Sequence, residues 1–244
     1  MTKITRLKRK IAKKLLGNPI KCRHIELSLL SSVDDDPARP NDYLINLSLE
    51  AIKNAQKVDL DDICNKMTGT PYYPNIWPGE HYKLLAGFII ALKPKLVIEI
   101  GTDKGLSALT IKKFLLDDSK LVTFDIIPWN NFSDTCLSDS DFNNNFIQYV
   151  DDVSEYSTML KYKHLFKSAD FIFLDAAKDG KMEYKFLENL EKTGYKPNLI
   201  LLLDDIRLWN MLAFWRKIKY PKLDLTSFGH WSGTGLIQLQ KNNI

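Results

Sequence analysis

Apolar residues in the second half of the chain gather in short runs, and these runs alternate with stretches of helical spacing. The runs predict strands at Leu96–Ile100, Leu121–Asp125, Phe146–Val150, Phe171–Asp175, Leu199–Asp204, Leu223–Thr226 and Leu236–Gln240. The stretches between them predict helices at Leu106–Leu116, Ser154–Leu165, Met182–Leu190 and Trp209–Ile218. Nearly continuous apolar strands that alternate with helices are typical of a parallel sheet covered on both faces. We therefore expect an α/β fold with a Rossmann-like, doubly wound, seven-stranded and mostly parallel sheet.

The first part of the chain has a different pattern, with predicted helices and no predicted strand. Residues 3–16 form a basic amphipathic pattern that Gly17 ends, and further helices are expected at Tyr43–Gln56 and Glu80–Leu92. We predict an N-terminal basic helix and helical extension over residues 1–75 and a second domain over residues 76–244. The basic helix either contacts an anionic membrane surface or nucleic acid, or packs on its own domain.

The positive charge of the chain is concentrated in its first segment. The net charge is +4, but residues 1–16 hold seven lysines and arginines and no acid, so the other residues sum to −3. This balance argues against a broad nucleic-acid-binding face, and we expect no nucleic acid partner. Peripheral contact between residues 1–16 and a membrane is the alternative that the charge favours.

Cysteine usage and hydropathy indicate the compartment. The three cysteines, Cys22, Cys64 and Cys136, lie far apart and lack the spacing of a zinc site or a disulfide framework. No apolar run reaches the roughly 20 residues that a membrane-spanning helix needs. We expect a cytoplasmic protein, either free or at the inner face of a membrane.

A glycine-bearing turn follows the first predicted strand and carries the first chemical signal. Glu99 precedes Gly101, and Gly105 completes a GxxxG spacing where backbone can approach a ligand closely. A nicotinamide dehydrogenase would need GxGxxG and would bind a pyrophosphate, which Glu99 would repel. The carboxylate of Glu99 would instead suit a cationic ligand, such as the amino or sulfonium group of S-adenosylmethionine. A plain glycine-rich turn is the alternative.

Acidic residues recur at the ends of the predicted strands. Asp125 ends the second strand and can accept hydrogen bonds from two ribose hydroxyls. Asp152, after the third strand, either binds an adenine amino group or caps the helix that follows. Ser107, at the start of the helix after the glycine turn, is a further candidate contact for the nucleoside ligand.

Two segments of the sequence resemble known methyltransferases. The run VIEIGTDKGLSA (97–108), together with Asp125 and the strand alternation, is similar to class I S-adenosylmethionine-dependent methyltransferases. The segment FLDAAKD (173–179), followed by LDD (203–205), resembles the catechol and caffeoyl-CoA O-methyltransferase group. The resemblance covers about residues 76–240 and implies methyl transfer from S-adenosyl-L-methionine.

The resemblance also implies roles for particular residues. Asp175, which also borders the donor, would hold a divalent metal together with Asp204 and Asp205, and Lys178 would lie beside the substrate hydroxyl. Asp205 stands where the family usually has asparagine, and Ala177 stands where it often has aspartate. As alternatives, the Asp204–Asp205 pair could cap the next helix, and Lys178 could be a solvated loop lysine.

The chemistry of these residues agrees with the implied roles. Carboxylate oxygens suit Mg²⁺, Ca²⁺ or Mn²⁺, and such a cation makes a nearby hydroxyl easier to deprotonate. Lys178 would accept that proton if its pKa were lowered by the metal and by burial.

A turn between the last two predicted strands offers a second candidate base. The segment 228–235 contains three glycines and predicts a hairpin turn. His230 and Trp231 at its tip could line an acceptor pocket, and His230 titrates in the range that a general base needs. The segment before the first predicted strand, with Glu80 and His81, either covers the methyl donor or packs as a cap.

Three functions follow from these observations. The first is a metal-assisted O-methyltransferase that acts on a small-molecule or glycan hydroxyl. The second is a metal-independent methyltransferase with His230 as the base, acting on a sugar or lipid-linked glycan. The third is a nucleoside-binding module without catalysis.

Overall fold

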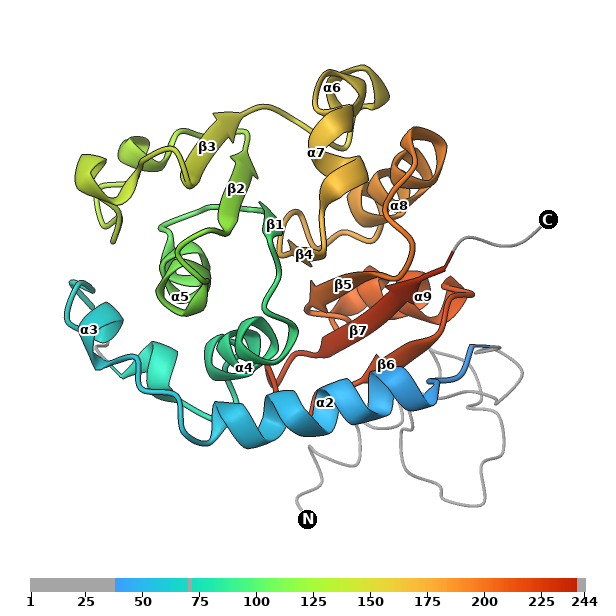
Figure 1. Ribbon diagram of the computed structural model, residues 1–244, viewed down its shortest axis with the longest axis horizontal. Helices are drawn as coiled ribbons and strands as arrows, with labels where there is room; N and C mark the ends of the chain where they lie inside the picture. Colours follow the sequence, from blue (N-terminus) through green and yellow to red (C-terminus); the bar gives the residue numbers. More distant parts are fainter. Residues whose placement is uncertain (1–37, 70–71, 241–244) are drawn as a thin grey trace, which may run out of the picture. The chain divides into compact units, whose positions relative to one another are not determined.

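The structure is a computed structural model and describes residues 38–69 and 72–240. The predicted basic helix over residues 3–16 lies outside the described residues. Figure 1 shows the compact unit that begins at Ala38. Across the described ranges, no helix is long and apolar enough to cross a membrane.

The centre of this unit is a seven-stranded sheet with the order β3-β2-β1-β4-β5-β7-β6. The strands are β1 (Leu96–Ile100), β2 (Lys120–Asp125), β3 (Phe146–Val150), β4 (Phe171–Leu174), β5 (Leu199–Asp204), β6 (Lys222–Asp224) and β7 (Thr234–Leu239). Strands β1 to β5 run parallel, and β7 is antiparallel to both of its neighbours. The prediction of a mostly parallel, seven-stranded α/β sheet is confirmed.

The helices also follow the sequence pattern closely. The longer ones are α2 (Asp42–Ala55), α4 (Tyr82–Leu92), α5 (Leu106–Phe114), α8 (Lys181–Thr193) and α9 (Trp209–Lys217). The single helix expected over residues 154–165 is divided into α6 (Tyr156–Lys161) and α7 (Lys163–Ser168). The division falls at Tyr162, whose backbone, with φ −104° and ψ 17°, leaves the helical region.

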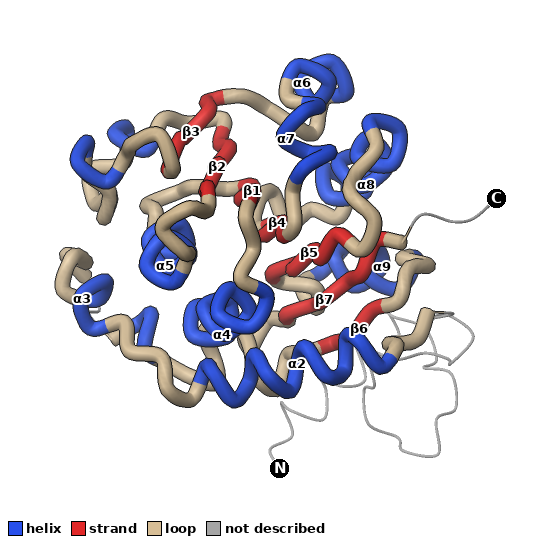
Figure 2. Tube along the Cα trace, viewed as in Figure 1, coloured by secondary structure: helices blue, strands red, loops and turns tan. Residues whose placement is uncertain are grey.

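Helices cover both faces of the sheet, which explains the continuous apolar strands. Figures 1 and 2 show α4 and α5 on one side of the sheet and α7 and α8 on the other. Successive strand residues point to opposite faces, so Val97 and Phe171 enter one core while Ile98 and Ile172 enter the other. Strands covered on both faces therefore carry mostly apolar side chains.

Helix α2 belongs to the same core as the sheet. Its N-terminus is capped by Asn41, whose side chain accepts a hydrogen bond from the Leu44 amide. A Cβ added at Gly87 of α4 would lie 2.2 Å from the Ala51 carbonyl oxygen, so α2 and α4 approach closely. The predicted extension over residues 1–75 includes this helix, and its apolar face, including Leu47, is buried against α4.

The topology brings the predicted acids to one edge. Strands β1, β2, β4 and β5 are parallel, so their carboxyl ends lie together, and ligands of such sheets bind beyond those ends. The turn between β6 and β7 reaches the same edge. The Gly79 amide donates to the Gly229 carbonyl and the Trp231 amide donates to the Gly79 carbonyl, which fixes that turn beside the segment before α4.

Candidate active site

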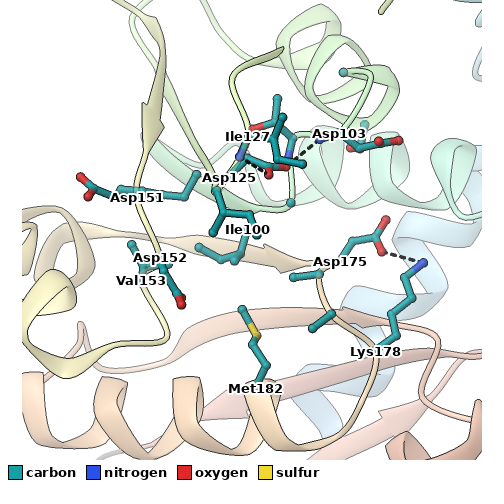
Figure 3. A pocket seen from close by; sticks show the side chains of 18 of the residues that line it. Ile100, Asp103, Asp125, Ile127, Asp151, Asp152, Val153, Asp175, Lys178 and Met182 are labelled. Carbon is teal, nitrogen blue, oxygen red and sulfur yellow. Dashed lines mark hydrogen bonds and ion pairs between the residues drawn. The ribbon is translucent and has the colours of Figure 1, made fainter. Parts of the chain in front are cut away.

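A cavity of about 530 Å³ opens at the carboxyl ends of β1, β2 and β4. This volume lies in the range of small-molecule and cofactor sites. Figure 3 shows Asp125, Asp152, Asp175 and Lys178 around it. The sequence-predicted residues that line the cavity are Gly101, Gly105, Ser107, Asp125, Asp152, Asp175 and Lys178.

The glycine turn forms one wall of this cavity. Gly101 has φ +100°, and an added Cβ would lie 1.9 Å from the Asp175 carbonyl oxygen. Gly105 has φ +88°, and its Cβ would collide with the side chain of Leu137. Both positions therefore require glycine, and the backbone is left free to approach a ligand.

Asp125 organises the same turn through its carboxylate. Oδ2 accepts hydrogen bonds from the backbone amides of Thr102 and Asp103, both at 2.9 Å. Oδ1 accepts one from the Ile127 amide at 2.9 Å. A carboxylate oxygen can accept about two hydrogen bonds, so Oδ1 retains capacity for a ribose hydroxyl. The ribose contact stays a prediction.

Glu99 lies behind the turn and not on the cavity wall. Its side chain is fully buried, and the Thr123 hydroxyl donates to Oε2 at 2.6 Å. Burial raises the pKa of Glu99 to about 8, although the hydroxyls of Ser107 and Thr123 act in the opposite direction. Ser107 both lines the cavity and neighbours this carboxyl. Direct contact between Glu99 and a cationic ligand stays a prediction.

Asp152 lies across the cavity from Asp175 (Figure 3). Its Oδ1 accepts a hydrogen bond from the Ser154 amide at 2.9 Å, in the turn that leads to α6. This bond agrees with the capping alternative. The side chain also lines the cavity, so the adenine contact stays a prediction.

Three carboxylates converge beside the cavity, and of the three only Asp175 lines it. Asp175, Asp204 and Asp205 each offer an oxygen within 4.8 Å of the others. The Lys178 amine lies among them, 3.0 Å from Asp175 Oδ1, 3.7 Å from Asp204 Oδ2 and in contact with Asp205. Lys178 and Asp205 both have left-handed backbones, with φ +59° and +58°. Such strained conformations are concentrated at functional sites.

The close approach of these groups changes their ionisation. Burial and the neighbouring Asp204 carboxylate raise the pKa of Asp175 to about 6. Burial alone would lower the pKa of Lys178, but Asp175, Asp205 and Asp204 outweigh it and raise that pKa. Lys178 therefore stays protonated in this arrangement, whereas a general base would need the opposite shift.

Two histidines complete the cluster from loops that are distant in the sequence. His230 Nδ1 lies 3.0 Å from Asp204 Oδ1, and His81 Nδ1 lies 3.4 Å from the same oxygen. Burial would lower the pKa of His230, but hydrogen bonds to Asp204 and Asp205 raise it to about 10. His230 is therefore protonated near neutral pH, which does not suit the base of a metal-independent reaction.

The neighbours of His230 in the same turn differ in where they lie relative to the cluster. Trp231 is 73% exposed, so only His230 of this pair points into the cluster. The Ser232 hydroxyl lies 2.8 Å from His230 Nδ1 and also bonds Asp205. Sequence reasoning missed Ser232 and the proximity of His81 to Asp204. The only signal for His81 was a polar residue placed just before an apolar helix.

The residues of this cluster fit a divalent cation. Neither ring nitrogen of His81 has a hydrogen-bond partner among the described residues, and the same holds for Glu80 Oε2. Buried polar atoms are normally paired, because an unpaired one costs free energy. Carboxylate oxygens and imidazole nitrogens are both common ligands of divalent metals.

Comparison with models of protein families identifies the family of this chain. The family model described as O-methyltransferase matches residues 60–211. The chain belongs to the O-methyltransferase family. The match spans the glycine turn, Asp125 and the cluster of carboxylates, and it confirms the predicted S-adenosylmethionine-dependent methyltransferase class. Comparison with curated protein sequences finds no match.

Solved structures share the fold of this O-methyltransferase family member. A methyltransferase from Geobacter sulfurreducens has a TM-score of 0.55 and 17% identity, covering 82% of this chain and 98% of its own. A putative caffeoyl-CoA O-methyltransferase from Staphylococcus aureus has a TM-score of 0.53 and 16% identity, covering 80% and 97%. An SAH-bound methyltransferase from Podospora anserina has a TM-score of 0.52 and 18% identity, covering 80% and 88%. At these identities the likeness shows the fold alone.

Proposed function

We propose that this protein transfers a methyl group from S-adenosylmethionine to a hydroxyl of a small molecule or glycan, assisted by a divalent cation. The observation that carries the proposal is the convergence of Asp204 and Asp205 on Asp175, which lines the cavity. A cation between these carboxylates would lie next to the space in which a methyl donor binds. Mg²⁺, Ca²⁺ and Mn²⁺ suit the carboxylate set.

The cavity supports the donor part of the proposal. Gly101 brings backbone to the wall, and Asp152 lies across the cavity from Asp175. Asp125 Oδ1 accepts one hydrogen bond, from Ile127, and has capacity for a second from a ribose hydroxyl. One relative of the same fold is described as bound to SAH. We expect the amino acid part of the donor near Gly101 and the adenine near Asp152.

The cluster supports the acceptor part. A bound divalent cation makes a neighbouring hydroxyl more acidic, which is the change that a methyl acceptor oxygen requires. Lys178, at the edge of the cavity beside Asp175, would hold that oxygen by a charge-assisted hydrogen bond. Methyl transfer is an in-line displacement in which the oxygen–methyl bond forms as the sulfur–methyl bond breaks, S-adenosylhomocysteine leaves, and the hydroxyl proton passes to solvent. Alignment of the oxygen, methyl and sulfur atoms is the remaining requirement.

Two measurements on the full chain test this proposal. Calorimetric titration with S-adenosylhomocysteine should give binding, and a labelled methyl donor should label catechols or monosaccharide glycosides only when Mg²⁺ or Mn²⁺ is present. Asp175→Asn should abolish labelling while S-adenosylhomocysteine still binds. Asp118→Asn, which changes an exposed acid paired with Lys95, is the matched control. Full labelling in excess chelator would contradict the role of the cation, and absence of S-adenosylhomocysteine binding would contradict the donor.

A further inference from the structure

We propose that the metal of this protein is a first-row transition cation held through the imidazoles of His81 and His230 together with Asp204, and not a cation held by carboxylates alone. The inference rests on the proposed function, because it specifies the cation of the same site. It begins with a second group of potential ligands, His81, Asp204 and His230, whose ligand atoms lie within 4.8 Å of one another. All three residues are buried.

The distances in this group match those between neighbouring metal ligands. Metal–nitrogen and metal–oxygen bonds of about 2.1 Å place adjacent ligand atoms roughly 3.0 to 3.4 Å apart. Asp204 Oδ1 lies 3.0 Å from His230 Nδ1 and 3.4 Å from His81 Nδ1. The two imidazole rings meet edge to face with their centroids 5.4 Å apart, so both can face one centre.

His81 supplies an observation that is independent of the acidic cluster. Its side chain is 3% exposed, and neither Nδ1 nor Nε2 makes a hydrogen bond within the described ranges. Among the described residues, the imidazole has only ion-pair contacts in place of hydrogen bonds, with Asp204 Oδ1 3.4 Å from Nδ1 and Asp175 Oδ2 4.0 Å from Nε2. Buried polar atoms are normally hydrogen-bonded. A cation beside Asp204 would give Nδ1 a direct ligand bond.

Each histidine also has a carboxylate oxygen near Nε2, the ring nitrogen that does not face Asp204. His230 Nε2 lies 3.7 Å from Glu80 Oε2, which is itself buried without a hydrogen bond. His81 Nε2 lies 4.0 Å from Asp175 Oδ2. Metal-binding histidines almost always direct their second ring nitrogen toward such a group, which fixes the tautomer and raises the basicity of the ligand. These two contacts are longer than hydrogen bonds, and would shorten if a cation fixed the rings. A cation at His230 Nδ1 would displace the proton that this ring shares with Asp204.

The ligand types determine which metals the site would select. Imidazole suits Zn²⁺, Cu²⁺, Fe²⁺, Ni²⁺ and the similar Co²⁺, whereas Mg²⁺, Ca²⁺ and Mn²⁺ prefer oxygen. The histidines should therefore contribute strongly to the binding of Co²⁺ and little to the binding of Mg²⁺. This difference separates the inference from an all-carboxylate site.

Direct detection of nitrogen ligands is the first test. The chain has four histidines, and the double variant His24→Ala/His164→Ala leaves only His81 and His230. Pulsed electron paramagnetic resonance of this protein with one equivalent of Cu²⁺ should show modulation from imidazole nitrogen. Because wild-type residues form the site, the result does not depend on whether a His81 variant folds. A signal from oxygen ligands alone would overturn the inference.

Affinity measurements are the second test. In calorimetric titrations of the full chain, His81→Gln and His230→Gln should each weaken Co²⁺ binding at least tenfold and change Mg²⁺ binding less than twofold. His164→Ala, an exposed position, is the control. Equal losses for both metals, or none, would overturn the inference while leaving the carboxylate-held cation of the proposed function intact. If neither metal binds the wild-type chain, both claims about the cation fail.

Discussion

The Lys178 amine lies 3.0 Å from Asp175 Oδ1 and occupies the space between three carboxylates. A side-chain cation thus stands beside the position that a divalent cation would take. The two positive charges compete for the same oxygens, so the affinity of the site for metal depends on Lys178.

Lys178→Met should tighten Mg²⁺ binding about tenfold, roughly 1.4 kcal/mol, because it removes the competing charge. The same variant should lose most of its methyl transfer, since the acceptor oxygen loses a hydrogen-bond donor. Lys196→Met provides the control, because Lys196 forms a comparable ion pair with Asp170 away from the cavity. Calorimetry with both variants measures the effect, and an unchanged affinity in Lys178→Met would contradict the competition.

Gly101→Ala should destabilise the fold by on the order of 3 kcal/mol or more and abolish S-adenosylhomocysteine binding. The new Cβ would overlap the Asp175 carbonyl oxygen, and φ +100° is unfavourable for alanine. Gly69→Ala is the matched control, because no atom lies within 4 Å of its added Cβ. Thermal unfolding and calorimetry report the two effects. A Gly101→Ala protein as stable as Gly69→Ala would show that the turn is looser than described.

Glu99 should give the protein a specific dependence of stability on pH. Its folded pKa of about 8 lies above the ordinary value of 4.5, so the folded state keeps a proton that the unfolded state releases. The free energy of unfolding should therefore fall as pH rises from about 4.5 to 8 and level off above that, by up to about 5 kcal/mol in total.

Glu99→Gln removes this proton equilibrium and keeps the size of the side chain. The difference in unfolding free energy between wild type and Glu99→Gln, measured by denaturant titration, should change across that pH window in favour of the variant. A constant difference would mean that Glu99 ionises at its ordinary pKa in the folded protein.

Asp125→Ala should weaken S-adenosylhomocysteine binding at least tenfold, roughly 1.4 kcal/mol. The substitution removes both a candidate ribose contact and the acceptor that holds the amides of Thr102 and Asp103. Asp125→Asn keeps one acceptor oxygen, so its loss should be smaller. Isothermal titration of the two variants beside Asp118→Asn measures the series, and equal affinity in all three would exclude Asp125 from the donor site.

Gly87→Ala should destabilise the protein by about 2 to 4 kcal/mol, because the new methyl group would push α2 away from α4. The unfolding transition should stay single, since α2 and the sheet share one core. Circular dichroism during thermal unfolding measures both properties. Two separate transitions would instead support an independent helical extension before residue 76.

The local pattern of the chain is enough to predict most of the fold. Strand β1 is predicted because Leu96–Ile98 and Ile100 form a nearly continuous apolar run, which is typical of a strand buried on both faces. The sequence predicts one helix where the structure has α6 and α7, because no glycine or proline marks the break at Tyr162. The glycine motif around Gly101 and the acids at the strand ends can also be found in the sequence, because each is defined by residues that lie close together along the chain.

The arrangement of the cluster depended on the tertiary structure. The sequence placed Asp175, Asp204 and Asp205 at one sheet edge, since parallel strands end together. It could not place His81 beside Asp204, because that contact requires the segment before α4 to pair with the turn that holds His230. Nor could it predict the raised pKa of His230, which arises from carboxylates that only the folded chain brings near. Local motifs indicated the glycine turn and carried the family resemblance, because short spacings define them. Long-range packing decided which groups surround the three carboxylates.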